Sequence, residues 1–78
     1  MVGLKYEPRK LSLREIQVVQ LIALEKNSQE IARILCISLE TVKTHRKNIM
    51  IKLDTVNVAG VVRRAFEEQL LRIPVEVI

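Results

Sequence analysis

Aromatic residues are almost absent from the sequence, which has no tryptophan, one tyrosine and one phenylalanine in 78 residues. Proteins that bind nucleic acids by stacking bases need a platform of aromatic side chains, so this composition argues against that mode of binding. The one cysteine, Cys36, cannot form an internal disulfide, and with the one histidine, His45, it cannot build a zinc site. A single cysteine fits a reducing compartment, and we expect a cytoplasmic protein.

Long apolar runs and catalytic motifs are missing as well. No apolar segment approaches the ~20 residues that span a bilayer, and the N-terminus lacks the apolar stretch of a signal peptide. We therefore expect a protein that stays inside the cell, with no membrane partner. The sequence has no nucleophile–base pair, no carboxylate pair at helical spacing, no glycine-rich phosphate loop and no metal cluster. These absences predict a protein that is not an enzyme and that needs neither a metal nor a cofactor.

The positive charge is concentrated in one short segment. Lysine and arginine number 13 against 9 acidic residues, so the net charge of +4 is modest. Much of the excess falls in residues 38–53, where Glu40 is the one acidic residue. The cations of this segment are Lys43, Arg46, Lys47 and Lys52. A basic stripe on one element is the footprint expected of a polyanionic partner, although a solvated helix face has the same composition.

Four helix-capping residues divide the chain into segments with helical spacing of their apolar residues. Two of them belong to capping boxes, in which Glu15 and Glu30 follow the cap by three residues. The caps are Ser12, Asn27, Ser38 and Asn57. The predicted helices run over about 13–24, 28–35, 39–53 and 58–71, and Pro74 prevents regular continuation of the last.

The boundary between the second and third predicted helices is short, because only residues 36–38 separate them. Two helices joined by so few residues, the second carrying the basic excess, are typical of a helix-turn-helix. Its first helix braces the second across the DNA backbone. The sequence therefore predicts an all-α fold, a small four-helix bundle that contains a helix-turn-helix. We expect this domain over residues 11–72, with an N-terminal arm or linker over 1–10 and a C-terminal tail over 73–78.

The third predicted helix, about 39–53, has two distinct faces at 3.6 residues per turn. Its apolar stripe holds Val42, Ile49 and Leu53, and the opposite stripe holds Glu40, Lys43, Thr44, Lys47 and Ile51. Lysine donates to guanine O6 and N7, and a threonine forms hydrogen bonds with bases or touches a thymine methyl group. We therefore expect Lys43, Thr44 and Lys47 to read bases in the major groove.

Residues at the edges of this face suit phosphate groups, which set the register of a protein on DNA but not its sequence preference. These candidates are Ser38, Thr41, Arg46, Asn48 and Lys52. Two of these residues have a specific alternative role. Ser38 also serves as a helix cap, and Lys52 is an equally good partner for the carboxylate of Glu15. We expect His45, close to the apolar stripe, to pack in the interior.

Several fragments, in this order and spacing, resemble the LuxR-type helix-turn-helix domain, also called the NarL or GerE type. The fragments are Leu11-Ser12-Leu13-Arg14-Glu15, Glu30-Ile31-Ala32, Ile37-Ser38, Thr41-Val42-Lys43-Thr44-His45 and Asn48-Ile49-Met50-Ile51-Lys52-Leu53. The resemblance covers residues 11–71. It implies a four-helix DNA-binding domain of bacterial transcription regulators, whose third helix recognises DNA and whose fourth is the usual dimer contact. It implies the same base-reading and phosphate positions as the helical-face argument.

The sequence departs from the family's pattern at four positions. Glu25 and Asp54 stand where the family usually has glycine after the first and third helices. A glycine there serves a left-handed C-cap, so we expect altered or slightly strained helix ends. Ile51 is apolar where the family tends to be polar. Val58 replaces a frequent arginine near the start of the fourth helix.

The fourth predicted helix has a wide apolar surface. Its dimer-seam candidates are Val58, Val61, Val62 and Ala65, although all four could equally belong to the core. The leading hypothesis is sequence-specific binding of double-stranded DNA by a bacterial transcription regulator or its output domain, acting at the nucleoid. We expect a homodimer on DNA, with RNA polymerase as a further candidate partner. The alternative is a helical protein-interaction or dimerisation module that does not read DNA.

Overall fold

Four α-helices follow one another in residues 10–71, the part of the chain that the computed structural model describes. They are α1 (Leu13–Ala23), α2 (Ser28–Leu35), α3 (Leu39–Leu53) and α4 (Val58–Glu67). No strand occurs within residues 10–71, so the predicted all-α class and the helix-turn-helix, α2 and α3, are confirmed. The tail over 73–78 and all of the arm over 1–10 except Lys10 lie outside the described residues.

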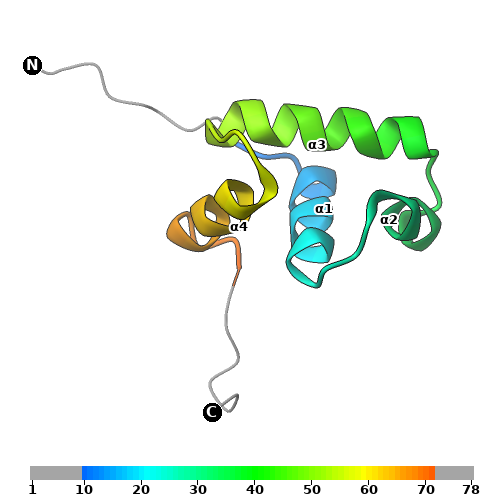
Figure 1. The fold of residues 1–78 in the computed structure, drawn as a ribbon, viewed down its shortest axis with the longest axis horizontal. Coiled ribbons are helices and arrows are strands. Elements are labelled where there is room, and N and C mark those ends of the chain that lie inside the picture. The colour runs from blue at the N-terminus through cyan, green and yellow to red at the C-terminus, as the bar shows by residue number, and fades with distance from the viewer. Residues whose placement is uncertain (1–9, 72–78) are drawn as a thin grey trace, which may run out of the picture.

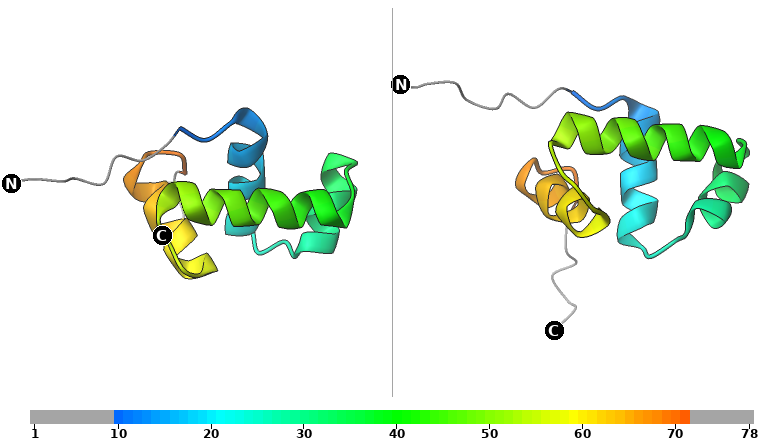
Figure 2. Two further views of the ribbon diagram at one scale, coloured as in Figure 1. Left: turned by 90° about the horizontal axis from the view of Figure 1, so that it is seen from above. Right: turned by 45° about the horizontal axis from the view of Figure 1, so that its top comes forward.

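The longest helix, α3, packs against all three of the others. Figure 1 shows α1 beneath the middle of α3, with α2 near one end and α4 near the other. The two further views in Figure 2 agree that these helices lie to one side of α3. Among residues 10–71, no other helix therefore covers the opposite side of α3.

Each helix contributes to a single apolar core. The buried side chains are Leu11, Val18, Val19, Ile22, Ile31, Val42, Ile49, Leu53, Val61 and Ala65. The predicted inner stripe of α3 is confirmed, because Val42 and Ile49 are 0% exposed and Leu53 is 1% exposed. Fully burying a side chain of this size contributes about 1.5–3 kcal/mol, so this stripe holds α3 firmly against the other helices.

Side-chain caps determine where the helices begin, as predicted. The Ser12 Oγ accepts from the backbone N–H of Glu15 at 3.1 Å, and the Glu15 Oε1 accepts from the backbone N–H of Ser12 at 2.8 Å. Asn27 and Glu30 form the same reciprocal pair at 2.8 Å in both directions. Each box satisfies two backbone N–H groups that the helix itself leaves without a partner.

The helices end in left-handed residues, and none of these is a glycine. The φ angles are positive at Glu25 (66°), Cys36 (58°), Asp54 (56°) and Gln69 (63°). After each one, the next N–H donates to a carbonyl five residues back, at 2.8 to 3.1 Å. This is the Schellman arrangement, which usually has glycine in the left-handed position. The expectation of strain at Glu25 and Asp54 therefore has a direct geometric basis.

The predicted end of the fourth helix was wrong. The prediction extended it to about Leu71, but α4 ends at Glu67 because Gln69 adopts the left-handed conformation. The N–H of Leu70 then donates to the carbonyl of Ala65 at 2.8 Å and turns the chain back toward the core. Leu70 and Leu71 are half-buried and pack against the core cluster. Their helical spacing therefore reflected burial after the turn and not continued helix.

No helix among the described residues is long and apolar enough to cross a membrane. Within residues 10–71, no three or more histidine, cysteine, aspartate or glutamate side chains gather in a way that could hold a metal ion.

Replacing Glu25 by glycine should stabilise the protein. A left-handed conformation costs an L-residue roughly 1–2 kcal/mol, and glycine avoids this cost. Part of the gain is offset because glycine has greater conformational entropy in the unfolded chain. We expect Glu25→Gly to raise the free energy of unfolding by up to about 1 kcal/mol, or ~4–8 °C in Tm for a domain of this size. Gln20→Gly, at an exposed position within α1, is the control and should lower Tm. A lower Tm for Glu25→Gly would contradict the assignment of strain.

Candidate nucleic-acid interface

The uncovered face of α3 is a basic strip about 22 Å long, the length of a helix of 15 residues. Lys43, Thr44 and Lys47 all lie on it and are exposed. Lys43 pairs with Glu40 at 3.9 Å, but the two side chains are 59% and 84% exposed, so solvent screens the pair. The three predicted base-reading side chains are thus brought together on one open surface and are free to meet a ligand.

The turn of the helix-turn-helix positions the start of this face. Cys36 supplies the left-handed residue, and the N–H of Ile37 donates to the carbonyl of Ala32 at 3.0 Å. Ile37 is half-buried against the core, which fixes the angle between α2 and α3. The three residues between the helices therefore act as a rigid corner.

Two hydroxyl groups lie at the N-terminus of α3. The Ser38 Oγ accepts from the backbone N–H of Thr41 at 3.0 Å and donates to the Thr41 Oγ1 at 2.9 Å. Both residues are exposed. The N-terminal end of a helix carries partial positive charge and unpaired N–H groups. Ser38 and Thr41 therefore cap the helix and still lie where an anion is attracted.

The other phosphate candidates lie in different surroundings. Asn48 is exposed, whereas Arg46 is half-buried and lines a small pocket with Ile22, Met50 and Val58. Arg46 thus lies on the side of α3 that faces α1 and α4. His45 is half-buried and lies at the edge of the interior.

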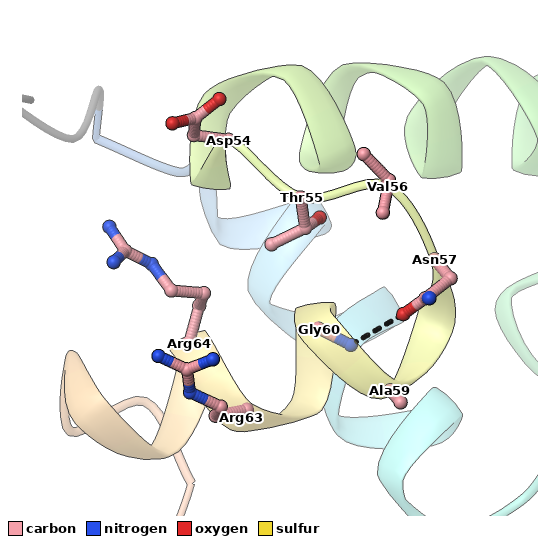
Figure 3. A pocket seen from close by; sticks show the side chains of 8 residues that line it. All are labelled: Asp54, Thr55, Val56, Asn57, Ala59, Gly60, Arg63 and Arg64. Atoms are coloured by element: carbon pink, nitrogen blue, oxygen red, sulfur yellow. Dashed lines mark hydrogen bonds between the residues drawn. The ribbon is translucent and has the colours of Figure 1, made fainter.

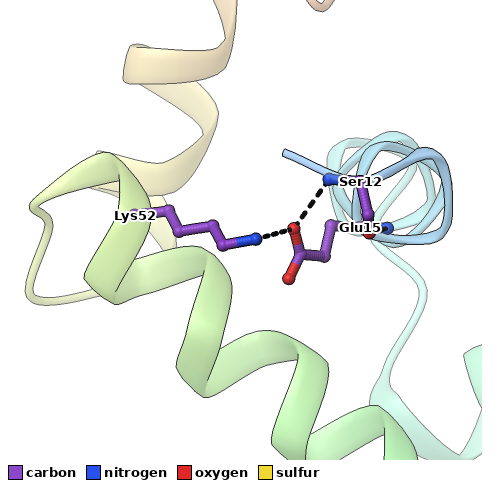
Figure 4. Close-up of polar contacts among 3 residues, drawn as sticks. All are labelled: Ser12, Glu15 and Lys52. Atoms are coloured by element: carbon purple, nitrogen blue, oxygen red, sulfur yellow. Dashed lines mark hydrogen bonds and ion pairs between the residues drawn. The ribbon is translucent and has the colours of Figure 1, made fainter. Parts of the chain in front are cut away.

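Lys52 pairs with Glu15, the alternative that the sequence left open for it. Its Nζ donates to the Glu15 Oε1 at 2.8 Å, and the two side chains are 27% and 6% exposed. Figure 4 shows the same carboxylate oxygen accepting from the Ser12 backbone and from Lys52. One oxygen atom thus joins the capping box of α1 to the last turn of α3. Lys52 is the phosphate candidate that the tertiary structure already uses.

The environment of Glu15 favours its charged form. Burial by itself would raise the pKa of this carboxyl group, but four interactions act against burial. The hydrogen bond from Lys52, the hydrogen bond from the Ser12 backbone, the positive charge of Lys52 and the hydrogen bond with the Ser12 side chain together hold the pKa below its ordinary value. The buried carboxylate is therefore compensated and stays ionised.

The four dimer-seam candidates divide into two pairs. Val61 is 2% exposed and Ala65 is 0% exposed, and both belong to the core of the chain itself. Val62 is half-buried, and Val58 is 43% exposed. A second copy cannot reach Val61 or Ala65 without opening the fold. The candidate seam is therefore reduced to Val58 and Val62.

A hollow of about 470 Å³ at the junction of α3 and α4 was not predicted from the sequence (Figure 3). Its lining residues are Asp54, Thr55, Val56, Asn57, Ala59, Gly60, Arg63 and Arg64. Asn57 caps α4 by accepting from the N–H of Gly60 at 2.9 Å. The two arginines pair with acidic residues of α4, Arg63 at 3.1 Å and Arg64 at 3.7 and 3.9 Å. The hollow is thus a consequence of the turn between α3 and α4, and its two arginines already form ion pairs with acidic side chains.

A helix-turn-helix whose second helix presents an open basic face, braced from behind by two further helices, defines a DNA-binding domain of the helix-turn-helix class. Residues 9–65 match the family described as bacterial regulatory proteins, luxR family. The match covers more than half of the chain, so the chain belongs to this family of DNA-binding transcription regulators. The family assignment made from the sequence is confirmed.

Similar proteins include a response regulatory protein and a transcriptional activator. An uncharacterized response regulatory protein of Escherichia coli (strain K12), YgeK, is 54% identical over 44 residues, which are 56% of this chain and 30% of YgeK. The transcriptional activator protein CarR of Pectobacterium carotovorum subsp. carotovorum is 39% identical over 66 residues, or 85% of this chain and 27% of CarR. The chain thus spans less than a third of the length of either relative.

A solved structure supports the fold. The response regulator ChrA of a heme-sensing two-component system superposes with a TM-score of 0.77 at 35% sequence identity. The superposition covers 83% of this chain and 33% of the ChrA chain. The four-helix arrangement is therefore that of a domain found within a longer response regulator.

The lowered pKa of Glu15 predicts a loss of stability in acid. The pKa of this carboxyl group is lower in the folded state than in the unfolded state, where it is about 4.3. Its contribution to stability is therefore complete above the unfolded pKa and is lost as the pH falls through the folded pKa. We expect the free energy of unfolding, measured by urea titration, to fall between about pH 5 and pH 3. Glu15→Gln keeps the acceptor for Ser12 but removes this part of the decline.

The matched control for this experiment is Glu30→Gln, the same substitution in the exposed capping box of α2. It separates the contribution of the Lys52 pair from the loss of a carboxylate in a capping box, because Glu30 forms the same kind of box with Asn27. An unchanged acid decline in Glu15→Gln would show that the pair with Lys52 does not control it.

Proposed function

We propose that the protein recognises specific sequences of double-stranded DNA by inserting α3 into the major groove. Lys43, Thr44 and Lys47 would contact base edges. The observation that carries this proposal is the asymmetry of α3, whose inner stripe is completely buried while its outer face is open and basic. An α-helix fits the major groove, where each base pair presents a distinct set of donors and acceptors.

Groups at the edges of the same face would bind the phosphate backbone. Ser38 and Thr41 lie at the N-terminus of α3, Asn48 is exposed on α3, and Arg46 would reach the backbone from the side of α3 that faces α4. Contacts of this kind position the protein without reading sequence. Lys52 would act indirectly, by holding the last turn of α3 against α1.

Binding as a homodimer would use the exposed part of α4, with Val58 and Val62 at the seam. A helix-turn-helix dimer binds two half-sites about one helical turn, or ~10 bp, apart. The relatives are longer regulators, so we infer that this chain corresponds to their output domain, with RNA polymerase as a further candidate partner. A chromosomal target implies that the protein works at the nucleoid, in the cytoplasm.

Removing Lys43 and Lys47 together should remove most of the sequence preference. Each good base contact contributes about 1–3 kcal/mol of discrimination, so the ratio of Kd values between a scrambled and a selected duplex should fall at least tenfold in Lys43→Ala/Lys47→Ala. Selection from a random duplex pool supplies the target, and fluorescence anisotropy measures Kd. The affinity of the wild type should fall steeply with salt, because phosphate contacts release counterions.

A variant with the same change of charge outside α3 provides the control for this test. Lys26→Ala/Arg63→Ala alters two exposed residues and should keep the sequence preference. Wild-type binding that is insensitive to salt, or no binding to any duplex, would instead favour the alternative of a helical interaction module.

An acidic residue at the seam should uncouple two half-sites. Val58 is exposed, so Val58→Asp preserves the core, but it would place like charges together across a dimer interface. We expect affinity for a duplex with two half-sites to fall about fivefold or more, while affinity for a single half-site is unchanged. Leu24→Asp, at another exposed apolar position, is the control. Equal affinities for wild type and Val58→Asp on the two-site duplex would exclude this seam.

A further inference from the structure

Ile51 is an apolar side chain on a surface that is otherwise polar and basic. It is 52% exposed, and it is the one large apolar residue of α3 that the structure leaves exposed among residues 10–71. It belongs neither to the core nor to the half-buried residues packed around the core. Burying it against the rest of the chain is therefore not its role.

The position of Ile51 on α3 aligns it with the proposed base-reading residues. It follows the buried Val42 by about two and a half helical turns, which places it directly opposite the core-facing stripe. It lies one turn after Lys47, about 6 Å farther along the helix axis. For a helix that runs along the duplex, a rise of ~3.4 Å per base pair would make this about two steps.

The chemistry of the major groove limits what an aliphatic side chain can contact there. The base edges present hydrogen-bond donors and acceptors, and the one apolar group among them is the C5-methyl group of thymine. A branched aliphatic group placed over a donor or acceptor would exclude water without replacing the lost hydrogen bond, which is unfavourable. A thymine methyl group has no such cost.

We propose that Ile51 is a specificity-determining residue, which contacts the 5-methyl group of a thymine about two base pairs from the base read by Lys47. This inference rests on the proposed insertion of α3 into the major groove. It adds a hydrophobic contact at the C-terminal end of the recognition surface, beyond the lysine and threonine contacts.

Replacing thymidine by deoxyuridine tests the contact, because their bases, thymine and uracil, differ in the methyl group alone. Each thymine of a selected duplex is replaced singly, and Kd is measured for the full chain. At one position the wild type should bind about fourfold more weakly, the factor that burial of one methyl group brings. Ile51→Ala should bind the thymine and deoxyuridine duplexes equally.

Two further variants separate the methyl contact from general effects. Leu24→Ala removes an exposed apolar side chain at the C-terminal end of α1 and should keep the wild-type response to deoxyuridine. Ile51→Lys should lose that response and, by adding a cation on the DNA-facing side, steepen the salt dependence of log K by about one unit.

The outcomes distinguish this inference from the proposed function. Wild-type binding that is sequence-specific but insensitive to deoxyuridine at every position would overturn the inference and leave the function standing. A second result would have the same consequence. If Ile51→Ala weakens binding to the thymine and deoxyuridine duplexes by the same factor, and so still distinguishes the two duplexes as the wild type does, then Ile51 contacts the sugars or a second copy and not the methyl group. No binding to any duplex would overturn both.

Discussion

The ion pair between Glu15 and Lys52 is the interaction on which the orientation of α3 depends. Its 2.8 Å contact connects residues 37 positions apart, and it ends on a carboxylate that already caps α1. Removing either partner would take away the main compensation of a charge in a largely buried place, which is more costly than losing a surface ion pair. The pair therefore helps to hold the start of α1 and the end of α3 in one geometry. Together with the buried stripe of α3, it keeps the basic face of α3 turned outward.

The same helix therefore has two kinds of surface with opposite requirements. Its inner stripe is fully buried, whereas its outer face carries lysines that would be strongly unfavourable in a core. The rigid corner at Cys36–Ser38 and the core contacts of Ile37 keep the helix from rotating. A fixed helix presents its side chains to a groove without a further entropic cost of ordering, which favours sequence-specific binding.

Much of the fold was predictable because the helix starts are local events. Ser12, Asn27 and Ser38 each bond to a backbone N–H three residues on, so the signal is contained within four consecutive residues. The helix ends were harder, since Gln69 is not a residue type typical of a left-handed cap. Helical spacing of apolar residues continued past it, and the prediction of α4 therefore extended too far. Ile51 was recognised as a departure and was placed by its spacing on the outer stripe of α3, and the structure confirms that it is exposed.

The sequence by itself determined the helix starts, the two faces of α3 and membership of the family, because each depends on residues close together along the chain. Only the tertiary structure decided between the two roles of Lys52, and it separated the buried Val61 and Ala65 from the accessible Val58 and Val62. The pairing of Lys52 and the burial of each α4 residue depend on which surfaces meet across the core. A pair such as Glu15 and Lys52 is brought together by packing, and spacing along the chain does not determine packing.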